Sequence, residues 1–371
     1  MAIFNKKIKS IKKTMKQISF LLSVLFCLSI NINLKAEETS ESFNINELIM
    51  HHISDSHEWH IFDYKNSEGK EVVLSVPLPV ILFYNGQLDI FLSNKFEHGH
   101  KAVTKGKNTY IIHHDKIYVA NNDGELDYEH NNDEITITNA KPLDFSITKN
   151  VFSMLLVSII LLWVFISVSK SYKKYPGRPK GIQAFMEPLI LFVKEDIVRP
   201  SLGEKTDKFL PFLLTLFFFI LFNNLMGIIP FFPGNANATG NIAVTMTLAL
   251  FTFIAINFNG SKDYWKHTFW MPGVPVFVKP ILAVVEVIGI IVKPIALTIR
   301  LFANITAGHI IILSLIGLIF VMKTLWISPV SALFVLFMDC LELLVACLQA
   351  YIFTMLSALF IGISIKKHEH H

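Results

Sequence analysis

Cysteine is scarce in this sequence, and the motifs of nucleotide hydrolysis are missing. Three cysteines occur in 371 residues, and because Cys27 lies in the N-terminal segment, no disulfide framework can be read from them. Cys340 and Cys347 are about 10 Å apart along a helix axis, which is too far for a bridge. Neither a Walker A phosphate loop nor a nucleophile elbow occurs. We therefore expect no cofactor, no ATP binding and no hydrolytic site in this chain.

Charged residues are also few, and they are unevenly distributed. They make up 17% of the chain, against 52% hydrophobic residues, and the formal net charge is +4. The positive charges gather beside apolar runs, where they indicate membrane orientation and not nucleic-acid binding. The composition predicts a protein of the lipid bilayer without a nucleic-acid partner.

Residues 1–36 have the layout of a secretory signal peptide. Lysines up to Lys16 precede an apolar stretch from Ile18 to Ile30, and Leu34-Lys35-Ala36 follows it. The stretch is short for a spanning helix, although an uncleaved amphipathic anchor stays open as the alternative. Cleavage would start the mature chain near Glu37, outside the cytoplasm.

Residues 37–148 predict a small β-rich extracytoplasmic domain. The segment is polar and contains short strand-like runs separated by turn signals. Asn85-Gly86 lies between two of these runs and is a strong marker of a β-hairpin. The strands are expected at Glu71 to Pro77, Val80 to Tyr84, Leu88 to Leu92, Tyr110 to His113 and Lys116 to Val119.

Histidines cluster at the front of this domain. His51, His52, His57 and His60 stand close together in the sequence. Imidazole is a common ligand of zinc and copper, but the spacing matches no closed metal-binding motif. A solvated histidine-rich surface or a docking face is the competing interpretation, so the four residues are weak metal candidates only.

Residues 149–371 predict an all-α polytopic membrane domain with five crossings. By the positive-inside rule, the lysine-rich loop after the first span belongs in the cytoplasm, and so does the C-terminus. Gly181 to Arg199 mixes apolar and charged positions, which predicts an interfacial helix. The spans are expected at about 151–169, 209–229, 242–258, 275–322 and 329–365.

The last two apolar runs are unusually long. Thirty-seven continuous residues, 329–365, form a helix of about 55 Å, whereas the hydrocarbon core of a bilayer is about 30 Å thick. This run has no Gly/Pro turn cluster in its middle and ends at Lys366 and Lys367, which should be cytoplasmic. A strongly tilted two-helix hairpin satisfies both the length and the charge.

Arg300 lies inside the penultimate run, where a permanent positive charge is costly. A guanidinium at the bilayer centre costs about 2.5–3.5 kcal/mol on insertion scales. The nearest carboxylate in the run, Glu286, is fourteen positions upstream, so the counter-charge is expected from another helix or another protein. Glu286, Lys293 and Arg300 recur every seven residues and share one helix face. Asn304 follows one turn beyond Arg300 on the same side.

Small residues and further polar groups continue this pattern. Ala307 and Gly308 keep the Arg300 face low in profile, which suits a moving partner, whereas His309 points to the other side of a regular helix. The final run adds Asp339, Glu342 and Gln349. Ionisable groups inside a membrane usually carry function. The competing interpretation is that these groups pair with one another to hold the helices together.

The run from Arg300 to Gly308, Arg-Leu-Phe-Ala-Asn-Ile-Thr-Ala-Gly, resembles the Arg-Leu-Phe-x-Asn-x-x-Ala-Gly signature of subunit a of F-type ATP synthases. The resemblance covers about Val151 to Ile365 and includes Lys293-Pro294. It implies a stator subunit of a rotary ATP synthase in the bacterial inner membrane. The implied partners are the ring of c subunits, the peripheral-stalk b subunits and the remainder of the complex.

The resemblance also implies roles for individual residues. Arg300, with Asn304 beside it, would act on the carboxylate of each passing c subunit. His309, Glu342 and Gln349 would belong to the proton half-channel that opens to the outside. The opposite half-channel would contain Glu286, and Lys293 and Asp339 are secondary candidates.

One difference from the family pattern predicts a contact between two side chains. Some members carry an acid where His309 stands and a histidine where Glu342 stands. An exchange that preserves one acid and one imidazole predicts that the two side chains face each other in a single proton path.

Two other function classes use similar residues. A proton-coupled secondary transporter would place Arg, Glu and His within the membrane, but it predicts internal repeats, and we find no such repeat in the sequence. A membrane-anchored metal-binding protein would account for the histidines and would leave Arg300 unexplained.

Overall fold

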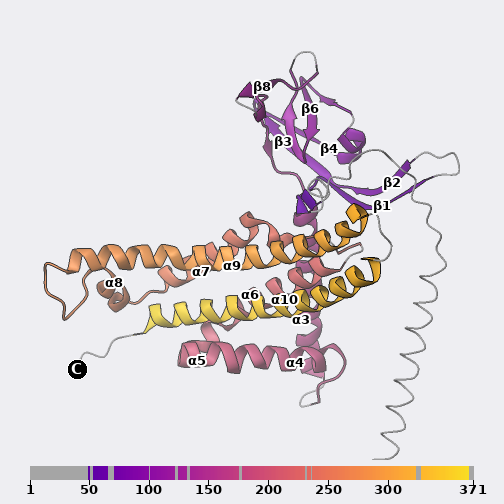
Figure 1. Ribbon diagram of the computed structural model, residues 1–371. Helices are drawn as coiled ribbons and strands as arrows, with labels where there is room; N and C mark the ends of the chain where they lie inside the picture. Colours follow the sequence, from indigo (N-terminus) through magenta and orange to yellow (C-terminus); the bar gives the residue numbers. More distant parts are fainter. Residues whose placement is uncertain are drawn as a thin grey trace, which may run out of the picture. The chain divides into compact units, whose positions relative to one another are not determined.

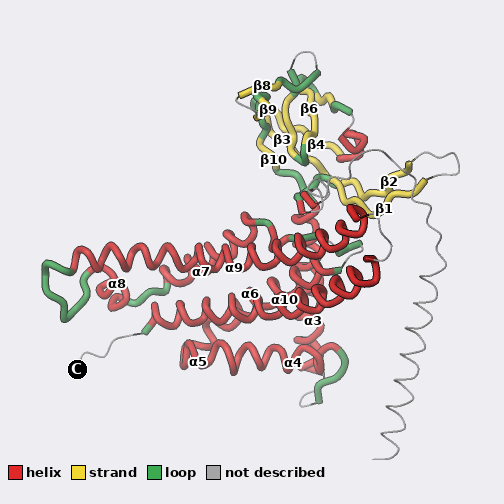
Figure 2. The backbone as a smooth tube through the Cα atoms, viewed as in Figure 1, coloured by secondary structure: helices red, strands yellow, loops and turns green. Residues whose placement is uncertain are grey.

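The computed structural model describes residues 49–50, 53–65, 71–99, 101–121, 124–131, 134–174, 178–229, 232–234, 236–322 and 327–366. These residues belong to one compact unit, Asn44–His371. They form a β-rich region followed by long helices (Figures 1 and 2). The predicted signal peptide, residues 1–36, lies outside the described residues, as do His51 and His52.

The β-rich region contains ten strands among its described residues. Every pairing is antiparallel, and the sheets have the orders β1-β2, β10-β3-β4, β5-β6-β7 and β8-β9. The strands are β1 (Glu58–Lys65), β2 (Glu71–Pro77), β3 (Pro79–Tyr84), β4 (Gln87–Leu92), β5 (Val103–Lys105), β6 (Asn108–His113), β7 (Lys116–Val119), β8 (Tyr128–Asn131), β9 (Glu134–Ile137) and β10 (Leu143–Asp144).

The chain turns between β3 and β4 at Asn85 and Gly86. Both residues have a positive φ, 47° and 77°, and Tyr84 pairs with Gln87 across the two-residue loop. Two successive residues of this kind are typical of the type I′ turn, for which Asn-Gly is the preferred pair. The hairpin predicted from the sequence is therefore confirmed.

The core of this region lies between the sheets. Inward positions of β3 and β4 alternate along each strand, as expected where one face is buried, and Val80, Leu82 and Phe91 are almost inaccessible to solvent. They pack with Phe96 and Tyr110 in one cluster. All five predicted strands are present, and β1, β5, β8, β9 and β10 are strands that the sequence patterns did not predict.

Eight helices follow in the described part of the chain, joined by short irregular segments. They are α3 (Lys149–Lys174), α4 (Ile182–Phe192), α5 (Arg199–Leu202), α6 (Thr206–Ile228), α7 (Ile242–Phe258), α8 (Lys262–Phe269), α9 (Lys279–Met322) and α10 (Ser328–Ile365). Helices α3, α6, α7, α9 and α10 lie over the segments in which spans were expected, although α3 extends beyond 151–169 at both ends and α9 begins four residues later than 275.

α9 and α10 are the long hairpin that the sequence predicts. They contain 44 and 38 residues, which correspond to about 66 and 57 Å of helix. They pack against each other and run across the direction of α3 (Figure 1). Helices of this length fit a bilayer core of about 30 Å only when they are strongly inclined.

The helical run from α4 to α6 is nearly continuous. The segment Val193–Val198 is π-helical and joins α4 to α5, and a 3₁₀ turn, Gly203–Lys205, leads into α6. α6 packs against both α3 and α10, and its Leu213, Phe218 and Ile220 are fully buried. This helix is therefore the centre of the helical core.

Four helical stretches in the described residues are long and apolar enough to cross a membrane, or five if α7 and α8 are counted as one bent span. The bend between α7 and α8 is 101°. The outer faces of these helices expose large apolar side chains such as Ile159 and Leu162, as expected for contact with lipid. The fold is mostly helical with a β-rich N-terminal region, in agreement with the predicted class.

Candidate functional site

Arg300 lies on an exposed, low-profile face of α9. Beside Ile299, the exposed positions of these turns are Arg300, Ala303, Asn304 and Ala307. Residues three or four apart share one side of a helix, so these four form a single surface, which we call the Arg300 face. The opposite side of the same turns, Leu297, Leu301 and Ile305, is buried in the helical core.

The Arg300 guanidinium has no partner within the described part of the chain. None of the ion pairs among these residues includes it, and no other interaction engages it. Arginine stays charged at any physiological pH and carries five hydrogen-bond donors. A charge of this kind inside a membrane requires a counter-charge, which the described residues do not supply.

His309 and Glu342 are in direct contact between α9 and α10. Nδ1 of His309 is hydrogen-bonded to Oε1 of Glu342, and the two side chains are only 14% and 4% exposed. The contact predicted from the exchange of acid and imidazole is confirmed. A carboxylate and an imidazole held this way can exchange a proton. The pair lies behind the Arg300 face, within the packing of the two helices.

Gly308 makes room for this pair. A Cβ atom at position 308 would lie 3.3 Å from Glu342 Oε1 and 3.4 Å from its Cδ. We expect Gly308→Ala to displace the carboxylate and to lower passive proton flux about threefold, since moving a side chain off its rotamer costs about 0.5–1.5 kcal/mol. The measurement is proton flux per assembled complex in membranes freed of the ATPase head.

Gly289, on the same helix, is the matched control for Gly308→Ala. A Cβ atom at position 289 meets nothing within 4 Å. Both changes raise helix propensity by about 1 kcal/mol, so that effect cancels when the two variants are compared. Equal flux in Gly308→Ala and Gly289→Ala would contradict the assigned role of Gly308.

A buried polar stripe continues from Glu342 along α10. Glu342, Ala346 and Gln349 are all buried on one side of this helix. Nδ2 of Asn224 in α6 donates to the Ala346 carbonyl oxygen at 3.2 Å. Asn224 Oδ1 in turn accepts from Thr239 Oγ1 at 2.6 Å. A chain of polar groups therefore joins the α6–α7 connection to the stripe.

Asn224 and Thr239 were not among the candidate residues that the sequence indicated. An asparagine inside an apolar span was the available signal for Asn224, because buried amides require partners. Thr239 carried no such signal, since it lies in a polar connection.

Of the remaining intramembrane candidates, Glu286 and Lys293 lie away from the His309–Glu342 pair, whereas Asp339 is close to Glu342. Glu286 is half-buried near α8, where its carboxylate acts electrostatically on Tyr264. It stands fourteen residues before Arg300, which is about 21 Å of helix. Lys293 Nζ lies 5.2 Å from the centre of the Phe360 ring on α10. Asp339 is half-buried on α10, one turn before Glu342.

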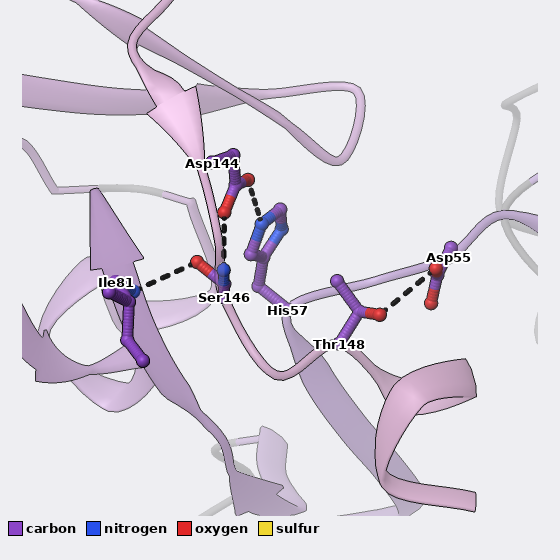
Figure 3. A network of polar contacts seen from close by, with 6 residues as sticks. All are labelled: Asp55, His57, Ile81, Asp144, Ser146 and Thr148. Atoms are coloured by element: carbon purple, nitrogen blue, oxygen red, sulfur yellow. Dashed lines mark hydrogen bonds and ion pairs between the residues drawn. The ribbon is translucent and has the colours of Figure 1, made fainter. Parts of the chain in front are cut away.

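The two histidine candidates among the described residues, His57 and His60, belong to no metal-ligating group. His57 Nε2 pairs with Asp144 Oδ2 at 2.7 Å, and the Ser146 backbone N–H donates to Asp144 Oδ1 at 2.8 Å (Figure 3). Partial burial alone would raise the pKa of Asp144, but the hydrogen bonds from His57 and Ser146 outweigh it and lower the pKa below its usual value. Among the described residues no group of three metal-ligating side chains occurs, and His60 is exposed.

Comparison with known proteins identifies the family of the helical region. The family model described as "ATP synthase A chain" matches residues 151–362, which is more than half of the chain. The chain belongs to the ATP synthase A chain family. The match contains the Arg300 face and the His309–Glu342 pair.

Individual relatives agree with this membership. ATP synthase subunit a of Chloroherpeton thalassium is 48% identical over 234 residues, which cover 61% of this chain and 69% of that protein. A subunit a from Chlorobium phaeobacteroides is 47% identical over 240 residues, covering 62% and 68%. One from Pelodictyon phaeoclathratiforme is 45% identical over 244 residues, covering 62% and 68%.

Membership of the ATP synthase A chain family establishes the general activity. The chain is a proton-conducting subunit of the stator, and it has no catalytic site of its own because ATP chemistry belongs to the F1 subunits. The proton-coupled secondary transporter, which the sequence left open, is not favoured.

The β-rich region matches a different family. Residues 48–145 match a model described as "Domain of unknown function (DUF8433)". This match ends before the ATP synthase A chain match begins at residue 151, so family membership alone assigns no role to the β-rich region.

Proposed function

We propose that the chain conducts protons through two half-channels that meet at Arg300, where they load and unload the carboxylates of a rotating ring of c subunits. Proton flow would thereby drive ATP synthesis. One observation carries the proposal: an exposed, unpartnered guanidinium lies on a face of small side chains, and a titratable pair is buried behind it.

Arg300 acts on each ring carboxylate that passes the Arg300 face. At an effective dielectric constant of 20, two opposite charges 4 Å apart attract each other by about 4 kcal/mol. The guanidinium stabilises the ionised carboxylate and promotes release of its proton. Because arginine does not give up its own proton, it also prevents a direct proton leak between the half-channels. Asn304, one turn further along, supplies an amide that can hold the guanidinium or its water.

The half-channel that opens to the outside contains His309, Glu342 and Gln349. His309 and Glu342 are titratable and in contact, so a proton can pass between them. Asn224 and Thr239 extend the polar route towards the α6–α7 connection. Asp339 is a secondary member because it lies one turn before Glu342 on the same helix.

The half-channel towards the cytoplasm contains Glu286, with Lys293 as its secondary member. Glu286 lies near the start of α9, close to α8. α8 carries Lys262 and Lys266, which the positive-inside rule assigns to the cytoplasm. The approximately 21 Å of helix between Glu286 and Arg300 leave room for an aqueous path on this side.

We also propose a bacterial inner-membrane location with five crossings. The N-terminal 36 residues act as a signal peptide, the β-rich domain faces outward and the C-terminus faces the cytoplasm. The partners are the c-ring, the peripheral-stalk b subunits, the rest of the synthase and the bilayer. Each proton that crosses a potential of 100 mV supplies about 2.3 kcal/mol, so ATP synthesis requires several protons, and ring rotation adds their contributions.

Disulfide cross-linking of the Arg300 face tests this function. We expect the chain to co-purify with a ring of small two-helix proteolipids. Ala307→Cys should form a disulfide with a cysteine placed next to the proteolipid carboxylate, because position 307 is exposed on that face. The yield is measured by non-reducing electrophoresis.

Leu162→Cys is the matched control for cross-linking. Leu162 is 63% exposed on α3, so it is exposed like Ala307 but lies on a different helix. Equal cross-linking from positions 162 and 307, or purification without a proteolipid ring, would contradict the proposal.

A further inference from the structure

Asp55 of the β-rich domain binds the starts of two membrane helices. Its Oδ1 accepts a hydrogen bond from the Asn150 backbone N–H at 3.0 Å, in the first turn of α3. Its Oδ2 accepts from Thr148 Oγ1 at 3.0 Å (Figure 3) and from Asn241 Nδ2 at 3.5 Å. Asn241 is the residue that caps α7, because its side chain accepts from the Ala243 N–H. A carboxylate is favoured at both helix N-termini.

Apolar and backbone contacts reinforce this attachment. The Trp59 side chain, 2% exposed, meets the Phe152 ring of α3 edge-on at 5.5 Å and the Phe232 ring at 5.3 Å. The Lys149 N–H donates to the Ser56 carbonyl oxygen at 3.0 Å. We call the segment from Ser54 to Trp59 the latch. It contacts both α3 and the α6–α7 connection.

The α6–α7 connection in turn lies close to the His309–Glu342 pair. A Cβ atom at Gly227, near the end of α6, would lie 3.9 Å from His309 Nε2 and 3.5 Å from the Ala236 carbonyl oxygen, so the imidazole and the connection approach the same point of α6. Thr306, one turn before His309 on α9, donates to the Gly240 carbonyl oxygen at 3.4 Å.

The described part of the α6–α7 connection is itself tightly packed. Ala236 and Ala238 are fully buried. The Asn237 side chain accepts from the Gly240 N–H at 2.8 Å, but its buried Nδ2 has no hydrogen-bond partner among the described residues. A buried amide donor without a protein partner is the kind of group that an ordered water satisfies.

We propose that the latch positions the α6–α7 connection over the His309–Glu342 pair, and that Asp55 is a positioning residue for proton entry from outside. This inference rests on the proposed outer half-channel. The β-rich domain thereby acquires a role in proton conduction without touching the proton. Loss of the Asp55 carboxylate removes its hydrogen bonds at the starts of α3 and α7, and the α6–α7 connection then keeps the Trp59–Phe232 contact with the latch.

Proton flux in Asp55 variants tests the inference. The complex is assayed in membranes freed of the ATPase head, and flux is divided by the amount of assembled complex. We expect Asp55→Ala to lower this flux about fivefold, the change that corresponds to losing a helix-capping interaction of about 1 kcal/mol. Asp55→Glu should restore part of it because the carboxylate is kept. Wild-type flux in Asp55→Ala would overturn the proposal.

Thiol labelling separates positioning from a merely structural role. Ala238→Cys is introduced with the native cysteines replaced by serine, and a membrane-impermeant maleimide is applied from outside. Position 238 is fully buried, so we expect protection when Asp55 is present and labelling in the Asp55→Ala background. Unchanged protection in that background would overturn the proposal as well.

Two further variants complete the test: a control at another carboxylate of the domain and a third substitution of Asp55. Glu125→Gln is the matched control, because Glu125 is an exposed carboxylate of the same domain, and it should leave flux and labelling unchanged. If Asp55→Ala does not assemble, Asp55→Asn keeps the shape and removes the charge. It should give intermediate flux, and wild-type flux with full protection would overturn the role of the charge. Coupled synthesis retained without Arg300 would instead refute the proposed function.

Discussion

Arg300→Ala is expected to abolish proton-driven ATP synthesis. The attraction between the guanidinium and a ring carboxylate is about 4 kcal/mol at an effective dielectric constant of 20, so its loss lowers the coupled rate about a thousandfold. The same variant should leave ATP hydrolysis by the detached head unchanged, because this chain contributes nothing to that site. Synthesis driven by an imposed proton gradient and hydrolysis by the released head are the two measurements.

Two variants control for charge and for assembly. Arg300→Lys keeps a positive charge, but a buried lysine can lose its proton, so at best a small fraction of synthesis should return. Arg199→Ala removes an exposed arginine that pairs with Glu195, and exposed pairs of this kind contribute little to stability. It should synthesise ATP normally. Coupled synthesis by Arg300→Ala would refute the role assigned to the guanidinium.

Exchanging His309 and Glu342 is the second change with a large expected effect. His309→Glu alone places two carboxylates in contact, and Glu342→His alone places two imidazoles there. Each single variant loses the pairing of an acid with an imidazole and should conduct protons poorly. The double variant restores one acid and one imidazole in the same contact, so its passive proton flux should exceed that of either single variant.

The control for this exchange places the new histidine one turn away from position 342. Asp339 lies one turn before Glu342 on α10, so combining His309→Glu with Asp339→His supplies the same groups at the wrong position. This combination should not recover flux. If the true exchange recovers no more than the shifted one, the two residues do not share a proton path.

Much of the local structure was predictable because it depends on neighbouring residues. The Asn85-Gly86 turn requires two positive φ values, which asparagine and glycine tolerate better than other residues. The limits of α10 follow from one uninterrupted apolar run. β1 was not predicted, because His60, Asp63 and the terminal Glu58 obscure its apolar alternation. Its pairing with β2 decides its structure.

The site was predictable in part for a similar reason. Arg300, Asn304 and Ala307 share a helix face by spacing alone, and the structure leaves that face exposed. The contact of His309 with Glu342 required a comparison with the family pattern, since the two are 33 residues apart. Asn224 and Thr239 were missed because their bonds join different helices and a connection.

The sequence by itself determined that this chain is a membrane protein with a charged arginine that no neighbouring residue neutralises. Hydrophobic run length and helical spacing are local properties, so they can be read without a fold. Only the tertiary structure decided that the packing of α9 on α10 joins His309 to Glu342 behind the Arg300 face. It also decided that Asp55, in the latch, binds the starts of two helices. Both depend on contacts between distant segments, and these form only when the whole chain packs.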